Sequence, residues 1–245
     1  MLKENIARLW RMTKRAGVEN LLKYLEESDF YSAPCSTKYH LAEPGGLAKH
    51  SLNVYELLFE KVCKYGLDIN VETRIVCGLG HDLCKINSYR QGGEPCSDAQ
   101  FNYLSNLING PAMNRVSAES RNKLYVSILV DLELTRDIPS DHASLLIDWL
   151  KNRPQEEMPE LPLSYSYDDQ LPLGHGEKSI SVLQNFIQLT DQEKLAIRWH
   201  MGPFTEGFKD LNRTYNEACN KCPLIVLLFT ADYEASRFLE ARADE

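Results

Sequence analysis

The sequence predicts an all-α protein with a single domain over residues 1–245. Apolar residues recur at three- and four-residue spacing in several long stretches, which is the period of an amphipathic helix. Recognisable start and stop signals bound some of them: Thr190 with Glu193 forms a capping box, and Gly202-Pro203 would end the helix that follows. A chain of 245 residues is long enough to bury one sizeable core without a second domain.

The first 86 residues are expected to form helices around one irregular loop. Residues 2–28 have helical periodicity, and Gly17 should divide them into two helices. Residues 29–46 contain two prolines and end in Gly45-Gly46, which predicts a loop. A long helix should run from there to about Tyr65. The apolar stretch 74–79 predicts another buried helix, with His81 and Asp82 on it.

Residues 87–173 are interpreted as an insertion between two parts of the core, residues 45–86 and 174–241, while residues 1–44 supply N-terminal helices and a loop. Within the insertion, helices are expected over 97–108, 117–134 and 139–150. Asp141 should accept hydrogen bonds from the exposed amides of the third helix. Residues 161–173 contain alternating Tyr-Ser and Pro-containing pieces, which favour either a small β-hairpin or an extended lid.

The closing third predicts three further helices. One opens at Gly174-His175-Gly176 and continues through Ile187. The second begins after Thr190 and ends near His200. The last runs from about Pro223 to Ala241.

Composition and charge restrict the partners and the compartment. The net charge is −8 with no long Lys/Arg run, which argues against binding long duplex nucleic acid but allows a small anionic substrate. No apolar run approaches the roughly 20 residues of a membrane span, and the charged N-terminus lacks a signal-peptide core. The 7 cysteines are an odd number, and several lie in apolar helical stretches, so we expect a reduced cytoplasmic compartment.

Histidines and aspartates on predicted helices are the candidate metal ligands. Adjacent His81 and Asp82 would lie about 100° apart on a helix, close enough to share one metal or for the carboxylate to bridge two. Asp232 lies inside an apolar helix, where a carboxylate is costly unless paired or bound to a metal. His175 lies between two glycines, which allow a close backbone approach. The full set is His50, His81, Asp82, His175, His200 and Asp232.

These six residues can hold two divalent metals if Asp82 bridges them. The expected ligands of the first metal are His50, His81, Asp82 and Asp232, and those of the second are Asp82, His175 and His200. The second metal then keeps open positions for water and substrate, as catalysis requires. Imidazole and carboxylate ligands suit Mn, Fe, Co, Ni or Zn, with Mg also open.

Two lysines are expected to contact an anionic substrate. Lys85 follows His81 by four residues and so should share its face. Lys178 follows His175 by three residues at a helix start, where backbone amides also favour anions. His40 should face substrate from the loop before His50, whereas His142 is expected at the surface.

The order H…HD…H…H…D resembles the HD-domain superfamily of metal-dependent phosphohydrolases in its two-metal form. Residues 45–52, GGLAKHSL, resemble the GGL…HS/T segment of bacterial HD-domain hydrolases, including a 3′–5′ exoribonuclease branch, and residues 81–85 resemble the HDxxK motif. The resemblance covers residues 45 to about 240 and implies a helical bundle with metals at its centre. Two features depart from the family: no GYP-like segment follows His175, and the first 44 residues do not resemble the barrel that precedes the exoribonuclease catalytic part.

The resemblance implies a phosphohydrolase or phosphodiesterase that acts through a metal-activated water. Asp82 would bridge the metals, and Lys85 or Lys178 would stabilise charge on the phosphoryl group. A nucleotide, cyclic nucleotide or short oligonucleotide is the expected substrate. Two alternatives remain open: a di-iron HD-domain oxygenase acting on a polyol or phosphonate, and a non-catalytic HD sensor that binds a nucleotide. Oligomeric state has no signal in the sequence.

Overall fold

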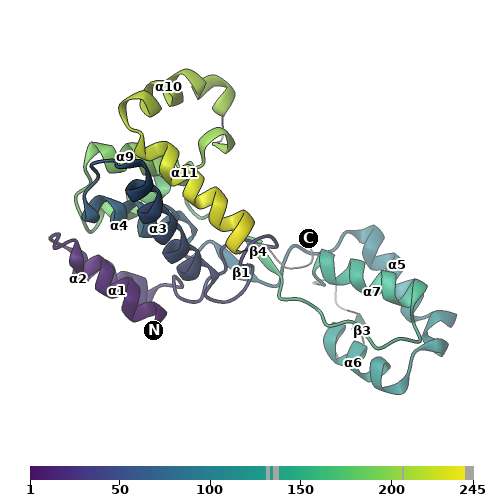
Figure 1. The fold of residues 1–245 in the computed structure, drawn as a ribbon. Coiled ribbons are helices and arrows are strands. Elements are labelled where there is room, and N and C mark those ends of the chain that lie inside the picture. Colours follow the sequence, from purple (N-terminus) through teal and green to yellow (C-terminus); the bar gives the residue numbers. More distant parts are fainter. Residues whose placement is uncertain (131–132, 135–137, 206, 241–245) are drawn as a thin grey trace. The chain divides into compact units, whose positions relative to one another are not determined.

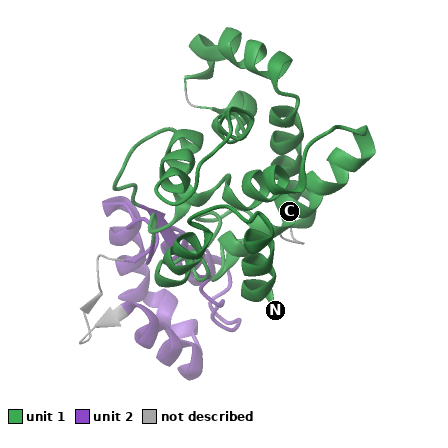
Figure 2. Ribbon diagram, turned by 90° about the vertical axis from the view of Figure 1, so that its left-hand side faces the viewer, with its two compact units in different colours: residues 1–89, 168–245 green, residues 90–167 purple. Residues whose placement is uncertain are grey.

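The computed structural model describes residues 1–130, 133–134, 138–205 and 207–240. The chain divides into two compact units, residues 1–89 with 168–245 and residues 90–167 (Figure 2). The expected insertion, residues 87–173, has its ends close to this division. The protein is mostly helical, which confirms the predicted all-α class.

The first unit begins with two helices that break where the sequence predicts. Helix α1 spans Leu2–Met12 and α2 spans Val18–Glu27 (Figure 1). Gly17 lies between them with φ of 89°, and a Cβ there would come within 1.8 Å of the Phe186 carbonyl oxygen. Only glycine fits this position, because it combines a left-handed conformation with a close backbone approach.

Two further helices carry the first candidate ligands. Helix α3 spans Gly46–Tyr65, as predicted, and α4 spans Val71–Gly80, with Asn70 accepting a hydrogen bond from the Thr73 amide at its start. A Cβ on Gly78 would lie 2.6 Å from the Tyr55 Cα, so this glycine allows α4 to pack closely on α3. The contact brings the end of α4 beside His50.

The expectation that His81 and Asp82 lie within a helix is corrected by the structure. Helix α4 ends at Gly80, His81 is its C-cap, and Asp82 has φ −110° and ψ 18°. A short 3₁₀ turn, Leu83–Lys85, follows. Asp82 therefore lies in the irregular step between two helical segments.

Four α-helices lie in the described residues of the C-terminal half of the first unit. Their bounds are α8 His175–Gln184, α9 Asp191–Arg198, α10 Phe208–Lys221 and α11 Leu224–Glu234. The capping box at Thr190 is confirmed, but α8 ends before Ile187 and α9 ends at Arg198, so His200 lies beyond its helix. A 3₁₀ turn, Gly202–Phe204, follows α9, and a π-helical turn, Ala235–Leu239, follows α11. The predicted end at Ala241 lies outside the described residues.

The core of the first unit is enclosed by α3, α4, α9 and α11. Helix α3 packs against α4 and α11, and α9 packs against α4 and α11 (Figure 1). The side chains between them are fully buried and apolar, including Leu47, Leu58, Ile75, Leu79, Ile197 and Leu228. His50, His81, Asp82 and His200 are also buried in this core. Buried polar groups are costly unless they have partners, so the burial of these side chains requires an explanation.

The second unit has its own core and three main helices. These are α5 Asp98–Ile108, α6 Ala118–Ile128 and α7 Ser140–Asn152, with a 3₁₀ segment, Pro111–Arg115, between the first two. Leu104, Leu124, Leu146 and Trp149 are fully buried within the unit. The helices expected over 97–108 and 139–150 are confirmed. Asp141 lies inside the first turn of α7 and accepts from the amide of its neighbour, His142.

The strands differ from the predictions. The helix expected over 117–134 ends at Ile128, where β2 Leu129–Val130 pairs antiparallel with β3 Glu133–Leu134. Strand β4, Tyr165–Tyr167, pairs with β1, Tyr89–Gln91, and not within residues 161–173 as a local hairpin would. None of the described helices is both long and apolar enough to cross a membrane.

Candidate metal centre

Two histidines and two aspartates converge at the centre of the first unit. The His50 Nε2 atom lies 3.2 Å from Asp232 Oδ1, 3.3 Å from His81 Nε2 and 3.6 Å from Asp82 Oδ2. His81 Nε2 lies 3.7 Å from Asp82 Oδ2. Ligands that bind one ion at about 2.1 Å are roughly 3.0–3.4 Å apart, so these atoms are close to the spacing that one metal requires. They come from α3, from the end of α4 and from α11.

A second group of ligand atoms lies on the other side of Asp82. Its Oδ1 atom is 3.4 Å from His200 Nε2, whereas its Oδ2 atom faces His50 and His81. His175 offers a ligand atom within 4.8 Å of Asp82, and its ring centre is 6.3 Å from that of His200. The two oxygens of Asp82 therefore face different histidines, and all six sequence-predicted ligands lie together.

Three of the histidines have their Nδ1 atoms fixed by oxygen acceptors. His81 Nδ1 donates to the Gly78 carbonyl at 2.9 Å, and His200 Nδ1 donates to the Ile197 carbonyl at 2.7 Å. His50 Nδ1 donates to Glu240 Oε2 at 2.9 Å. Metal-binding histidines characteristically use one ring nitrogen in this way, because it orients the other toward the ion. Each Nε2 atom here is directed toward an aspartate.

Electrostatics keep the carboxylates ionised despite their burial. Burial opposes ionisation of Asp82, but Lys85 and the neighbouring imidazoles outweigh it and hold the pKa of Asp82 well below its usual value. Burial likewise opposes ionisation of Asp232, but His50 outweighs it and lowers the pKa of Asp232 to about 2. Burial lowers the pKa of His81 to about 4 and also lowers the pKa of His175. Ionised carboxylates and neutral imidazoles are the forms that bind metal cations.

The pKa values of the remaining two candidate histidines, His50 and His200, are raised. Burial opposes protonation of His50, but Cys35, Asp232 and Glu240 outweigh it and raise its pKa. Asp82 raises the pKa of His200 against the same effect of burial. His200 Nε2 is nevertheless buried without a hydrogen-bond partner among the described residues. Such an atom is rare in a folded protein, and a metal ion would satisfy it. The donor set therefore fits a divalent metal.

The structure places the two candidate lysines differently. Lys85 Nζ lies 2.7 Å from Asp82 Oδ2 and 3.5 Å from Cys35 Sγ, so Lys85 reaches the centre itself. Lys178 forms an ion pair with Asp169 and donates to Ser88 Oγ at 3.1 Å. These contacts connect α8 to the residues before and after the second unit.

The centre opens into a cavity of about 620 Å³. Its residues are Tyr39, His40, Asp82, Lys85, His175, Met201, Phe204, Phe229, Asp232, Tyr233, Ser236 and Arg237. The volume is that of a site for a small molecule. His40 lines this cavity, and its contact with a substrate stays a prediction. His142 belongs to the second unit, where it is half-buried and contacts the Pro162 carbonyl at 2.7 Å, so its expected surface position is only partly correct.

A glycine in α8 positions the two later histidines. A Cβ on Gly176 would lie 2.4 Å from the Ile197 carbonyl oxygen and 2.5 Å from that of Arg198. Because glycine has no Cβ, the first turn of α8 can pack directly on the end of α9. This contact brings His175 toward His200.

Two participants at the centre were missed by the sequence reasoning. Glu240 is buried and accepts hydrogen bonds from both His50 and Asn53. It lies in a charged C-terminal stretch, whose composition predicts solvent exposure. Cys35 is buried beside Lys85 and lies 3.4 Å from His40 Nε2, but its loop has no periodic pattern. No local signal distinguishes either residue.

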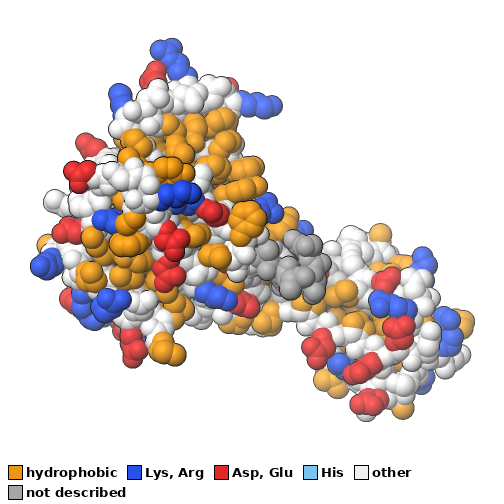
Figure 3. Space-filling model, in the orientation of Figure 1, with side chains coloured by type: hydrophobic (Ala, Val, Ile, Leu, Met, Phe, Trp, Pro, Cys, Tyr) orange, Lys and Arg blue, Asp and Glu red, His pale blue; other side chains and the backbone are white. Residues whose placement is uncertain are grey.

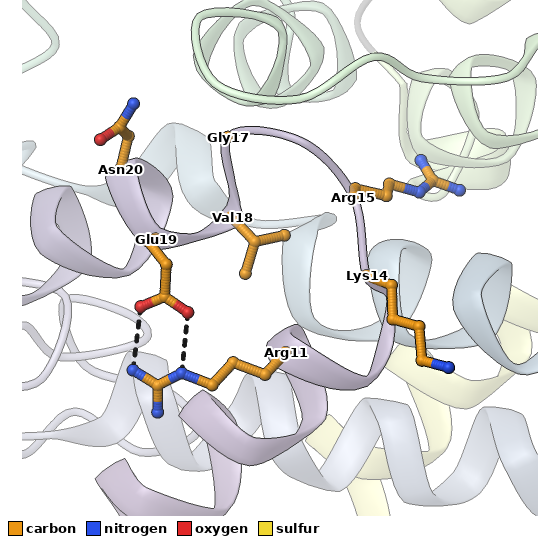
Figure 4. Close-up of a pocket in the computed structure, with 7 residues that line it drawn as sticks. All are labelled: Arg11, Lys14, Arg15, Gly17, Val18, Glu19 and Asn20. Carbon is orange, nitrogen blue, oxygen red and sulfur yellow. Dashed lines mark hydrogen bonds and ion pairs between the residues drawn. The ribbon is translucent and has the colours of Figure 1, made fainter.

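A second pocket, of about 450 Å³, is lined partly by basic residues. It lies between α1 and α2 and includes Arg11, Lys14 and Arg15 (Figure 4). Arg11 contacts Glu19 through two hydrogen bonds of 2.9 and 3.0 Å, and Arg15 is bound to Glu193. Since both guanidinium groups are already paired with carboxylates, this pocket is a poor candidate for a functional site.

Comparisons of the chain with protein-family models, with curated proteins and with solved structures found no match. The resemblance to HD-domain enzymes therefore depends on the ligand pattern in the sequence.

Proposed function

We propose that this protein is an HD-domain metal-dependent phosphoric ester hydrolase with two divalent metals. The observation that carries the proposal is the position of Asp82, whose two oxygens face different groups of histidines. One carboxylate so placed is suited to bridge two metals. The neighbouring cavity is large enough for a nucleotide, a cyclic nucleotide or a short oligonucleotide.

The chain's own residues account for ligand binding and for charge. His50, His81, Asp82 and Asp232 would hold one metal, and Asp82, His175 and His200 would hold the other. When bound, the pair of metals supplies a polarised phosphoryl oxygen and an activated water. Lys85 lines the cavity and lies 2.7 Å from Asp82, so its ammonium group both orients the carboxylate and offers positive charge to a phosphate that enters.

The proposal is tested by reconstituting the protein with Mn²⁺ or Fe²⁺ and assaying phosphate release from nucleotides, cyclic nucleotides and short oligonucleotides. Activity should depend on metal and be abolished by chelator. Oxygen consumption with a polyol or a phosphonate, without phosphate ester hydrolysis, would contradict the proposal and favour the oxygenase alternative.

Replacing Lys85 separates its role from metal binding. Lys85→Met should keep the metal content and lower turnover by about 10²-fold, the usual cost of removing one group that stabilises transition-state charge. Lys49→Met is the matched control, because Lys49 adjoins a ligand in sequence but is exposed and paired with Glu43. Loss of metal in Lys85→Met, or unchanged turnover, would show that the assigned role is wrong.

A further inference from the structure

One side of the cavity beside the candidate metal centre is made of aromatic rings. Phe204 and Tyr233 are stacked, with ring centres 6.0 Å apart and planes 10° from parallel. Phe229 contacts both, at 6.4 Å from Phe204 and 6.0 Å from Tyr233. We call Phe204, Phe229 and Tyr233 the aromatic wall. The three rings offer an apolar aromatic surface to whatever occupies the cavity, with Phe229 tilted by 41° and 31° against the two stacked rings.

Two of the three rings of the aromatic wall are exposed, although the backbone that carries them is closely packed. The Phe204 side chain is 62% exposed and Tyr233 is 43% exposed. Phe229 and Tyr233 are four residues apart on α11 and so share a face. A Cβ on Gly202 would lie 2.8 Å from the Phe229 ring, so the 3₁₀ turn that carries Phe204 packs closely on α11. Hydrophobic side chains gather along α11 in the space-filling view (Figure 3).

The rest of the cavity is strongly polar. Asp82, Lys85, His175 and Asp232 line it together with the rings, and Asp232 directly precedes Tyr233 on α11. The guanidinium of Arg237 lies 5.5 Å from the centre of the Tyr233 ring. One small cavity therefore combines an apolar aromatic surface with cations and candidate metal ligands. A ligand that matches both parts has a planar ring system and an anionic group.

We propose that the aromatic wall binds the base of a nucleotide by stacking, while the phosphate lies toward the metal centre and Lys85. The base must be unpaired, because a paired base within a duplex cannot enter a cavity of about 620 Å³. Stacking tolerates any base, since every base has a π-face. The phosphate end of this proposal rests on the proposed hydrolase function, whereas the base end rests on the rings alone.

Calorimetry on the protein as isolated tests base stacking on the aromatic wall, by comparing the affinities of ligands that differ only in whether they carry the base. Adenosine should bind measurably and ribose should not, and adenosine monophosphate should bind at least about 10-fold more tightly than ribose 5-phosphate. Phe204→Ala should weaken binding of both adenosine ligands by about 5- to 100-fold, the range measured for loss of a stacking ring. Phe204→Trp should preserve binding, and ribose 5-phosphate should bind equally to all variants.

Phe238→Ala is the matched control, because Phe238 is 79% exposed but does not line the cavity. Its affinities should equal those of the unaltered protein. Equal binding of adenosine monophosphate and ribose 5-phosphate would overturn the proposal. Adenosine binding that persists in both Phe204→Ala and Tyr233→Ala would also overturn it. So would self-association of the protein that Phe204→Ala abolishes while the affinity for adenosine stays unchanged. Binding that depends on the base, without phosphate release, would support stacking on the aromatic wall and contradict the proposed hydrolase function. Phosphate release that does not depend on the base would support the hydrolase function and contradict stacking on the aromatic wall.

Discussion

Asp82→Ala is expected to lose both metals and to reduce phosphate ester hydrolysis to background. The reason is that Asp82 Oδ2 faces His50 and His81 while Oδ1 faces His200, so its removal takes a ligand from each metal. Metal per chain should fall from about two to none by elemental analysis. Metals that bind the folded state also stabilise it, by about 2.7 kcal/mol at 100 times the dissociation constant. Chelator should therefore lower the thermal midpoint of the unaltered protein but not that of Asp82→Ala.

Three other variants test whether the loss of both metals is specific to Asp82, the proposed bridging ligand. His175→Ala and His200→Ala should each lose mainly one metal and most of the activity, because they contact only the second position. His142→Ala should retain both metals, since His142 lies in the second unit and contacts Pro162. Equal metal content in Asp82→Ala and the unaltered protein would refute the bridged centre and the hydrolytic mechanism derived from it.

Arg15→Ala is expected to destabilise the fold by about 3–5 kcal/mol, the cost of leaving a buried charge without its partner. Glu193 is 0% exposed, and Arg15 donates to its two oxygens at 2.5 and 2.8 Å. Thr73 Oγ1 also donates to this carboxylate, at 2.9 Å. The interaction joins the loop after α1 to α9 and α4. Urea unfolding monitored by circular dichroism measures the difference in free energy of unfolding.

Arg11→Ala is the matched control for this experiment. Arg11 is four residues earlier and forms an ion pair with Glu19 at 2.9 Å, but both side chains are exposed, so the expected loss is far smaller than that of Arg15→Ala. Similar losses in the two variants would show that the burial of Glu193 has no energetic consequence.

The Arg15–Glu193 pair also predicts a pH dependence. Burial raises the pKa of Glu193, but hydrogen bonds from Arg15 outweigh burial and hold that pKa below its usual value. The folded state thus favours the ionised carboxylate. Its contribution is present above the unfolded pKa of about 4.3 and is lost as pH falls through the lower folded value. The difference between Arg15→Ala and the unaltered protein should therefore shrink in acid, and a constant difference down to about pH 2 would contradict this account.

Local sequence patterns predicted the helices better than their ends. Periodicity indicated α1, α2 and α3, and capping chemistry placed the start of α9 at Thr190, because these signals lie within a few residues of the feature they specify. The ends of α4 and α6 were extended too far. Helix α4 ends at Gly80, before the candidate ligands, and α6 ends at Ile128, where strand β2 pairs with β3. The periodicity of apolar residues does not encode these contacts with distant or neighbouring segments.

Most of the candidate ligands were identifiable because they are polar residues in apolar stretches, and His175 because it lies between two glycines. Glu240 was not, since its acceptor role for His50 links positions 190 residues apart. The partner of Lys178 was equally hidden. Asp169 lies in a stretch without helical periodicity, and only the folded chain shows that this carboxylate contacts the lysine.

We propose that the His/Asp cluster of the first unit is a two-metal centre bridged by Asp82. The most direct measurement is an anomalous-difference map from crystals of the protein soaked in Mn²⁺. The account predicts two peaks, one among His50, His81 and Asp232 and the other beside His175 and His200, each within about 2.0–2.3 Å of an oxygen of Asp82. A map without a peak at Asp82, or with manganese bound only elsewhere on the chain, would contradict it.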